Sequence, residues 1–322
     1  METESVSRAE QRIGLIGVPM DLGTHLRGVD MGPSAIRVAG LNAKLESLGY
    51  VVHDRGNVSV TSAHAALEAE RKFEKLSSPK SKSLCFAPLV AQVCTELALK
   101  VEESLDQNEI PLVLGGDHSI AMGTLGGLAR HGQKTKKKYG LLWVDAHGDC
   151  NTPETSPSGN IHGMPMAVAL GHGAKLLTGL AGVRPMVQPA RTVLLGARDL
   201  DRGERDNIKR FGVHVFTMRQ LDERGVFACM KEALELLADG TDGFHLSFDI
   251  DSVDPSVAPG VGTPVSGGLT IREAHLVMEL VADSHKMRSC ELVEVNPALD
   301  VRNATAHLAS ELLMSAFGAS IL

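Results

Sequence analysis

Short apolar segments alternate along the chain with longer stretches in which apolar residues recur at helical spacing. The short segments predict roughly eight strands, over residues 13–17, 50–53, 110–114, 141–145, 192–195, 213–216, 244–249 and 291–294. The longer stretches predict helices, among them 35–48, 89–104, 122–130, 227–237, 271–283 and 306–317. Because strands that alternate with helices form βαβ units, we expect an α/β fold of three layers, α/β/α, around a mainly parallel sheet.

Two of the predicted strands are apolar at every position, over 111–114 and 141–144, as expected of parallel strands that are buried on both faces. No low-complexity linker or change of composition divides the chain. We therefore expect one domain over 1–322, with a loosely ordered or disordered start over 1–11. Ligands of such sheets bind at the carboxyl ends of the strands, so polar residues that directly follow a strand are the first candidates for a functional site.

Composition narrows the class of protein. With 43% hydrophobic and 22% charged residues among 322, the chain has the make-up of an ordinary globular protein. Its formal net charge of -7 argues against nucleic acid as a partner and mildly favours a cationic substrate. The basic run over 134–138 is the local exception, and it is typical of a solvated loop.

The cysteines and the hydropathy of the chain indicate the cellular compartment in which the protein is expected. The five cysteines are odd in number and none forms a Cys-x-x-Cys pair, so neither a disulfide framework nor a cysteine zinc site is expected. No apolar run is long enough to span a membrane, and the polar segment 1–11 lacks the core of a signal peptide. We therefore expect a reduced, cytoplasmic protein with no membrane partner.

The predicted strand over 141–145 leads directly into a run of potential metal ligands. Asp145, His147 and Asp149 stand at every second position, and such side chains project to the same side of an extended strand. Carboxylate and imidazole groups this close together are costly unless a cation neutralises them. The run therefore predicts a metal site at the end of a buried strand.

Two further strands end in the same chemistry. Asp249 and Asp251 stand two residues apart at one strand end, and His118 follows Gly115 and Gly116, which permit a sharp exit from another. Taken alone, an Asp-x-Asp pair is more often a turn or a helix cap, and a histidine after two glycines is usually structural. The agreement of three segments at strand ends instead favours one shared site.

Together the three segments supply six potential ligands that are rich in anionic oxygen: His118, Asp145, His147, Asp149, Asp249 and Asp251. Four carboxylates are too many for a single zinc ion. Oxygen-rich sites suit magnesium, calcium or manganese, and the histidines favour manganese. Four aspartates also allow carboxylates to bridge two ions about 3.5–4 Å apart, which lowers the pKa of a bridging water and generates hydroxide near neutral pH.

A polar loop, Asn151–Gly163, follows the ligand run. Its composition alone is typical of a connecting loop, but a loop fixed to a metal cage at one end is a favoured place for substrate contacts. Amide and hydroxyl donors, without Lys or Arg, suit a carboxylate held directly or through water. His162 in this loop, with a reference pKa near ~6.5, is suited to exchange protons with solvent.

The motifs Gly-Gly-Asp-His (115–118), Asp-Ala-His-Gly-Asp (145–149) and Ser-Phe-Asp-Ile-Asp-Ser-Val-Asp-Pro (247–255) together resemble those of the ureohydrolases. The loop Asn-Thr-Pro…Ser-Gly-Asn-x-His-Gly (151–163) resembles the version found in arginases. The resemblance covers nearly the whole chain. It implies an arginase-like fold, two Mn²⁺ per subunit, L-arginine as substrate and a homo-oligomer, either a trimer or a hexamer.

The resemblance assigns the six ligands to two manganese ions. One ion is held by His118, Asp145, Asp149 and Asp249. The other is held by Asp145, His147, Asp249 and Asp251, so that Asp145 and Asp249 serve both. The motif departs from the family at Gly148, where relatives usually carry Thr or Ala. This position points away from the ligands, and we expect little consequence beyond a looser backbone.

The resemblance also assigns residues to the two ends of the substrate. A planar guanidinium is best held by a carboxylate through paired hydrogen bonds, and the matching residue is Glu294. The residues expected to face the α-carboxylate are Asn151, Ser156, Ser158 and Asn160. Asp201 is expected to approach the α-amino group, with Asp199 and Glu204 in support, although a helix cap is the simpler explanation from the residues alone. Thr263 matches another active-site position, for which a plain turn role is equally reasonable.

The implied reaction is hydrolysis of L-arginine to L-ornithine and urea. A bridging hydroxide attacks the guanidinium carbon, Asp149 carries a proton to the leaving amine and His162 restores the proton balance with solvent. Three alternatives stay open. Another ureohydrolase such as an agmatinase would have no use for the loop 151–162, a two-metal phosphoesterase would need cationic groups around the phosphate, and a non-catalytic relative should have lost ligands.

Overall fold

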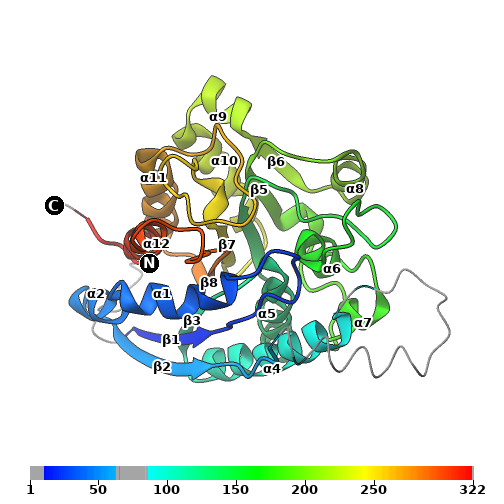
Figure 1. Cartoon of the computed structure of the whole chain (residues 1–322), viewed down its shortest axis with the longest axis horizontal. Helices are drawn as coiled ribbons and strands as arrows, with labels where there is room; N and C mark the ends of the chain where they lie inside the picture. Colours follow the sequence, from blue (N-terminus) through cyan, green and yellow to red (C-terminus); the bar gives the residue numbers. More distant parts are fainter. Residues whose placement is uncertain (1–10, 63–64, 66–83, 85, 321–322) are drawn as a thin grey trace.

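The computed structural model describes residues 11–62, 65, 84 and 86–320. Of the segment expected to be loosely ordered, residues 1–10 lie outside these ranges. The described strands form one sheet of eight, which Figure 1 shows with helices around it. The strands are β1 (Arg12–Gly17), β2 (Val51–Asn57), β3 (Glu109–Leu114), β4 (Gly140–Val144), β5 (Thr192–Ala197), β6 (His214–Thr217), β7 (Phe244–Asp249) and β8 (Met287–Val293).

The strands follow the order β2-β1-β3-β8-β7-β4-β5-β6, and each neighbouring pair is parallel. Parallel strands need crossover connections, and helices provide most of them here. The expected α/β fold is confirmed, with a sheet that is parallel throughout rather than only mainly so.

Helices cover both faces of the sheet, which gives the expected three layers (Figure 1). One face is covered by α1 (Gly32–Val38), α2 (Leu41–Ser47), α9 (Met218–Arg224), α10 (Val226–Ala238), α11 (Ile271–Asp283) and α12 (Ala304–Ala316). The other is covered by α4 (Ala87–Asp106), α5 (Ala121–Thr135), α6 (Pro165–Ala169), α7 (Lys175–Thr178) and α8 (Arg202–Phe211). Short 3-10 turns are η2 (Val29–Met31), η3 (His118–Ile120), η4 (Ile161–Gly163), η5 (Pro189–Arg191) and η6 (Ile250–Ser252).

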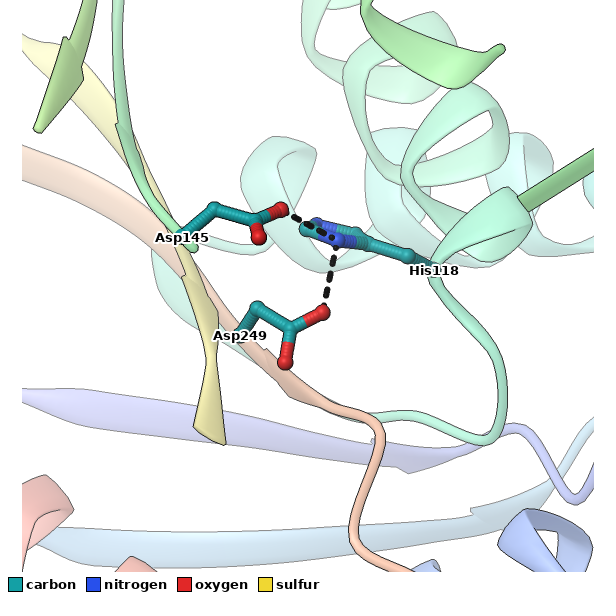
Figure 2. A group of neighbouring side chains, drawn as sticks. All are labelled: His118, Asp145 and Asp249. Carbon is teal, nitrogen blue, oxygen red and sulfur yellow. Dashed lines mark ion pairs between the residues drawn. The ribbon is translucent and has the colours of Figure 1, made fainter. Parts of the chain in front are cut away.

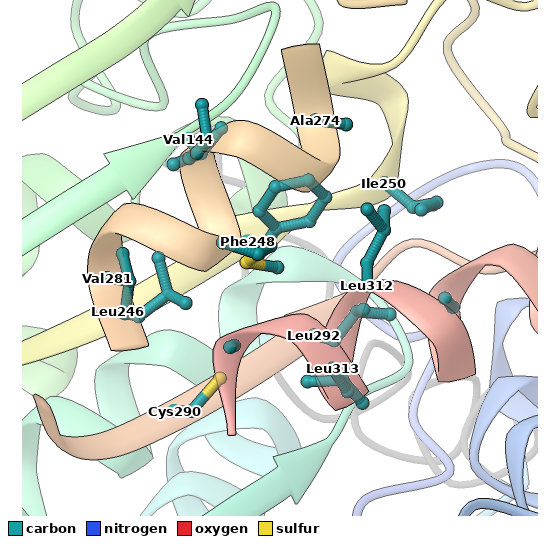
Figure 3. Close-up of a cluster of buried hydrophobic side chains, with 14 of the residues drawn as sticks. Val144, Leu246, Phe248, Ile250, Ala274, Val281, Cys290, Leu292, Leu312 and Leu313 are labelled. Atoms are coloured by element: carbon teal, nitrogen blue, oxygen red, sulfur yellow. The ribbon is translucent and has the colours of Figure 1, made fainter. Parts of the chain in front are cut away.

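Strand β4 shows why the central strands are apolar at every position. Leu142 and Val144 belong to the core under α9–α12, whereas Leu141 and Trp143 belong to the core under α4–α8. Figure 3 shows part of the first core, where strand residues Val144, Leu246, Phe248 and Leu292 lie among Ala274, Val281, Leu312 and Leu313 of α11 and α12. Because helices cover both faces, neither side of these strands tolerates a polar residue without a partner.

Two helical features differ from the prediction. The single helix expected over 35–48 is two helices, because Gly40 takes a left-handed conformation (φ 85°) between α1 and α2. Helix α8 follows Asp201, where the residues alone suggested a helix cap, but no range was predicted for it, since its sequence is mostly charged and buries Ile208 and Phe211 as its apolar residues. Among the described residues, no helix combines the length and the apolar character that crossing a membrane requires.

The turn that leaves β3 uses its glycines for close approach rather than for backbone freedom. Neither Gly115 nor Gly116 has a positive φ. A Cβ on Gly116 would instead overlap the carbonyl oxygen of Met20, which accepts a hydrogen bond from the N–H of Asp117 at 2.8 Å. The turn therefore depends on the β1 loop packing directly on the backbone just before His118.

Replacing Gly116 with Ala is expected to destabilise the fold by about 1–3 kcal/mol, since the methyl group would force the two backbones apart. Urea denaturation monitored by far-UV circular dichroism measures the change. Gly163→Ala is the matched control, because no atom lies within 4 Å of its added Cβ. Equal stability of the two variants would contradict the close-approach explanation.

Candidate metal centre and active site

The central strands of the sheet deliver the predicted ligands to one edge. His118 begins η3 after the turn over residues 115–117 that leaves β3, Asp145 follows β4, and Asp249 is the last residue of β7. In Figure 2 the side chains of Asp145 and Asp249 point toward His118. The Nδ1 atom of His118 lies 3.2 Å from Oδ2 of Asp145, 3.1 Å from Oδ2 of Asp249 and 3.0 Å from Oδ2 of Asp149.

A second group of ligands lies beside the first and shares Asp145 with it. The Nδ1 atom of His147 lies 3.1 Å from Oδ2 of Asp251 and 3.5 Å from Oδ1 of Asp145. The two oxygens of Asp145 therefore face the two different histidines. In each group the possible ligand atoms lie within 4.8 Å of one another. The first group is His118, Asp145 and Asp249, and the second is Asp145, His147 and Asp251.

The residues after β4 converge, but not by the route expected from an extended strand. Strand β4 ends at Val144, and Asp149 has a φ of 46°, in the left-handed region. A turn therefore brings the carboxylate of Asp149 to His118. The alternating spacing in an extended strand therefore does not explain how Asp149 reaches His118.

The donor set fits divalent cations. The Nδ1 atom of His118 is buried and has no hydrogen-bond partner among the described residues, although three carboxylates surround it. Burial and the charge of Asp145 raise the pKa of Asp149 to about 6, and burial with Asp251 and Asp145 raises the pKa of Asp249 well above its usual value. Carboxylates crowded in this way are relieved by a metal ion, and mixed nitrogen and oxygen donors suit one.

Behind His118 lies a buried chain of polar side chains that the sequence interpretation did not include. The Nε2 atom of His118 lies 2.8 Å from Oγ of Ser247, which donates to Oε1 of Glu291 at 2.8 Å. His245 lies 3.3 Å from the same oxygen and contacts Ser289 with its other ring nitrogen at 2.8 Å. These side chains sit on β7 and β8 and are fully buried.

This chain fixes the protonation of His118. Because the Ser247 hydroxyl donates to Glu291, it accepts from Nε2 of His118. The neutral form of the ring therefore carries its proton on Nε2 and directs the lone pair of Nδ1 toward the aspartates, where a metal ion would bind. Trp143 orients the same centre: its ring stacks on His118 at 4.0 Å, and its Nε1 donates to Oδ2 of Asp145 at 2.8 Å. Strand pairing places Ser247 beside Glu291, so no local motif indicates the polar chain behind His118.

His162 and Glu294 form a direct pair at the open side of this centre. The Nδ1 atom of His162 lies 3.0 Å from Oε1 of Glu294, which also accepts the backbone N–H of His118 at 2.9 Å. Burial alone would lower the pKa of His162, but Glu294 raises it to about 9. Glu294 has a φ of 66°, which is a strained conformation for a residue other than glycine. Asp149 is strained in the same way.

The predicted substrate loop is held by its own side chains. Ser156 Oγ accepts the N–H of Gly159 at 2.9 Å, and Ser158 Oγ accepts the N–H of Asn160 at 3.1 Å. Asn160 approaches the site, with its Nδ2 3.5 Å from Nε2 of His162. Asn151 is almost fully buried and is hydrogen-bonded to Asp201 and Thr155, so it lies behind the more exposed residues of the loop.

The residues predicted to read the amino end lie at the start of α8. Asp201 is the N-cap of this helix and forms a capping box with Glu204, as the residues alone suggested. Burial and the charge of Asp149 raise the pKa of Glu204 to about 8. Thr263, from another loop, donates to Oδ2 of Asp251 at 3.0 Å and so contacts a predicted metal ligand.

Gly148 faces α8 rather than the ligands, as expected, but the position is not loosely packed. A Cβ there would lie 2.9 Å from Cδ2 of Leu200 and 3.0 Å from Cδ1 of Ile208. A side chain at this position would therefore require the side chains of Leu200 and Ile208 to shift.

Comparison with known proteins places these features in a family. A sequence model of the Arginase family matches residues 11–318. The arginase of Brevibacillus brevis is 47% identical over 312 residues, which cover 97% of this chain and 99% of that protein. The solved structure of Bacillus caldovelox arginase has a TM-score of 0.89 at 47% identity, covering 97% of this chain and 100% of that one. An Entamoeba histolytica arginase solved in complex with L-ornithine has a TM-score of 0.82 at 29% identity, covering 96% and 99%.

An all-parallel sheet with two histidine–aspartate clusters at its carboxyl edge defines an α/β protein built around a candidate dinuclear metal centre. Within that class, the chain belongs to the arginase family. The family resemblance of its motifs is thereby confirmed.

Replacing Glu291 with Gln is expected to weaken manganese binding about 10–100-fold, because it removes the charge that polarises Ser247 and His118 but keeps the shape. Calorimetric titration of metal-stripped protein with Mn²⁺ measures the affinity. Glu109→Gln is the matched control, since Glu109 is also buried and paired with a histidine, His53, but lies at the amino end of β3. Equal losses of affinity in both variants would contradict a specific role for Glu291.

Proposed function

We propose that this protein hydrolyses L-arginine to L-ornithine and urea at a dinuclear manganese centre. The observation that carries the proposal is the position of Asp145, whose two oxygens face His118 in one cluster and His147 in the other. Two ions that share a carboxylate are held close enough to act on one water. The curated relatives named arginase support the substrate.

The six residues named from the sequence would hold the metals. His118, Asp145, Asp149 and Asp249 would bind one ion, and Asp145, His147, Asp249 and Asp251 the other. When bound, the two ions would supply Lewis acidity and would lower the pKa of a coordinated water, so that a nucleophile is available at neutral pH. Manganese is favoured because the set combines imidazole with several carboxylates.

Glu294 would bind the guanidinium group of the substrate. Its carboxylate lies beside His118 and at present accepts from His162. A planar guanidinium would replace His162 there with paired charge-assisted hydrogen bonds. On binding, the guanidinium of the substrate would take the place of the His162 ring beside Glu294. The pKa of Glu294 is lowered, so its carboxylate is ionised before the substrate binds.

The amino-acid end would be held by the loop after the metal ligands and by the start of α8. Ser156, Ser158 and Asn160 would face the α-carboxylate, directly or through water, with Asn151 behind them. Asp201 would face the α-amino group, supported by Glu204, and Thr263 would hold Asp251 in place. The relative solved with L-ornithine supports a site for such an amino acid.

Two side chains would handle protons. The Asp149 carboxylate, buried beside His118, would pass a proton to the nitrogen that leaves with ornithine. His162 remains partly exposed, and once released from Glu294 its ring would exchange that proton with solvent. By family inference, we also propose a cytoplasmic homo-oligomer, either a trimer or a hexamer.

The other functions fit less well. An agmatinase would not need the polar loop 151–160, because agmatine has no carboxylate. A phosphoesterase needs cationic side chains beside the phosphate. The motif loops 115–119, 145–163 and 247–255 contain no Lys or Arg, and Arg198 directs its guanidinium to backbone carbonyls, among them that of Asp251. A non-catalytic relative should lack ligands, and all six are present in this chain.

Metal-stripped protein is expected to release no urea from L-arginine, and activity should return as Mn²⁺ is added back, because the ligand clusters hold no alternative nucleophile. A colorimetric urea assay with arginine and agmatine in parallel measures both activity and preference. Faster turnover of agmatine would contradict the choice of substrate. Full activity in the stripped protein would contradict the metal-dependent reaction.

A further inference from the structure

Asn207, which the proposed reaction does not use, is a buried polar residue on α8. It stands three residues after Glu204, on the same side of the helix, and is followed by the apolar Ile208. A buried amide is costly unless it is hydrogen-bonded. Its Nδ2 atom donates to the carbonyl of Cys150 at 2.9 Å and to Oγ1 of Thr155 at 3.1 Å. Asn207 therefore joins α8 to the loop that follows the metal ligands.

Thr155 passes this constraint on to Asn151. Its hydroxyl oxygen accepts from Nδ2 of Asn207 and from the N–H of Thr152 at 2.9 Å. With both acceptor positions used, its single proton goes to Oδ1 of Asn151 at 2.8 Å. Asn151 is thus fixed in one of its two amide orientations, with Nδ2 directed away from Thr155.

The chain of hydrogen bonds closes on the carboxylate of Asp201. Nδ2 of Asn151 donates to Oδ2 of Asp201 at 2.8 Å, and Oδ1 of Asp201 accepts the N–H of Glu204 at 2.9 Å. Oε1 of Glu204 accepts the N–H of Cys150 at 3.3 Å, the residue whose carbonyl Asn207 holds. The result is a closed ring between loop and helix. Its members are Cys150, Asn151, Thr155, Asp201, Glu204 and Asn207.

The ring joins the two segments proposed to hold the two charged groups of an amino acid. Residues 156–160 directly follow Thr155, and Asp201 is a member of the ring. Glu294 and the metal ligands lie outside it. Cys150, which follows Asp149, is the member nearest the metal ligands, and its N–H bond to Glu204 does not depend on Thr155 or Asn207. A change at Thr155 or Asn207 would therefore act first on the elements that bind the amino-acid end, whereas Glu294 follows β8 and has no contact with the ring in the described hydrogen bonds.

We infer that Thr155 and Asn207 are positioning residues that make the site selective for substrates with an α-amino and an α-carboxylate group. They hold Asn151 and Asp201 in one rigid unit and so preorganise the binding of that end. This inference rests on the proposed hydrolysis of arginine and deepens it. Leucine at 207 or valine at 155 would fill the same space and leave Asn151 free to rotate.

The test compares Asn207→Leu and Thr155→Val with the unaltered protein, all loaded with Mn²⁺. The KM for arginine should rise about tenfold in each variant, the equivalent of one or two lost hydrogen bonds, with kcat changed by less than about twofold. The inhibition constant of butylguanidine, which carries the guanidinium group without an α-amino or α-carboxylate group, should stay unchanged. Binding of L-ornithine, measured by calorimetry, should weaken by the same factor as the KM rises.

Two controls separate this role from a structural one. Thr155→Ser keeps the hydroxyl and should have the KM of the unaltered protein. Thr95→Val removes a hydroxyl that donates to the carbonyl of Ala91 on α4 and should leave all constants unchanged. Equal losses of affinity for arginine and butylguanidine, or a fall in kcat alone, would overturn the inference. If the unaltered protein binds L-ornithine but releases no urea from arginine, the proposed reaction fails, and the ornithine data still decide the role of the ring.

Discussion

The repulsion among buried carboxylates at one edge of the sheet is the constraint on which this molecule depends. Asp145, Asp149 and Asp249 lie around a single imidazole nitrogen, and Asp251 lies beside the next histidine. Uncompensated, such a group would oppose folding. When cations compensate these charges, the carboxylates form a preorganised metal centre. The crowding that destabilises the metal-free protein is therefore what allows it to bind metal ions.

The rest of the fold maintains this crowding. Strands buried on both faces cannot shift in register, so β3, β4, β7 and β8 hold their last residues in fixed relation. Ser247 and Glu291 fix the histidine from behind. The left-handed conformations of Asp149 and Glu294 turn two carboxylates inward, and such strain persists only where the surrounding structure imposes it.

Much of this could be predicted from the sequence, because its strongest patterns are local. Apolar runs gave the sheet, and closely spaced acids and histidines after them gave the six candidate ligands. The polar chain behind His118 could not be predicted, since Ser247 and Glu291 become neighbours only through strand pairing. Asn207 was equally hidden, because a single polar residue in a charged helix has no local pattern. The turn that places Asp149 requires a left-handed residue, which no spacing rule indicates.

Metal stoichiometry tests the central claim most directly. Calorimetric titration of stripped protein with Mn²⁺ should give two ions per chain. Asp145→Asn should weaken both sites together, because each oxygen of this carboxylate faces a different cluster. Binding of one ion per chain, or a variant in which one site keeps its full affinity, would contradict a centre built on a shared carboxylate.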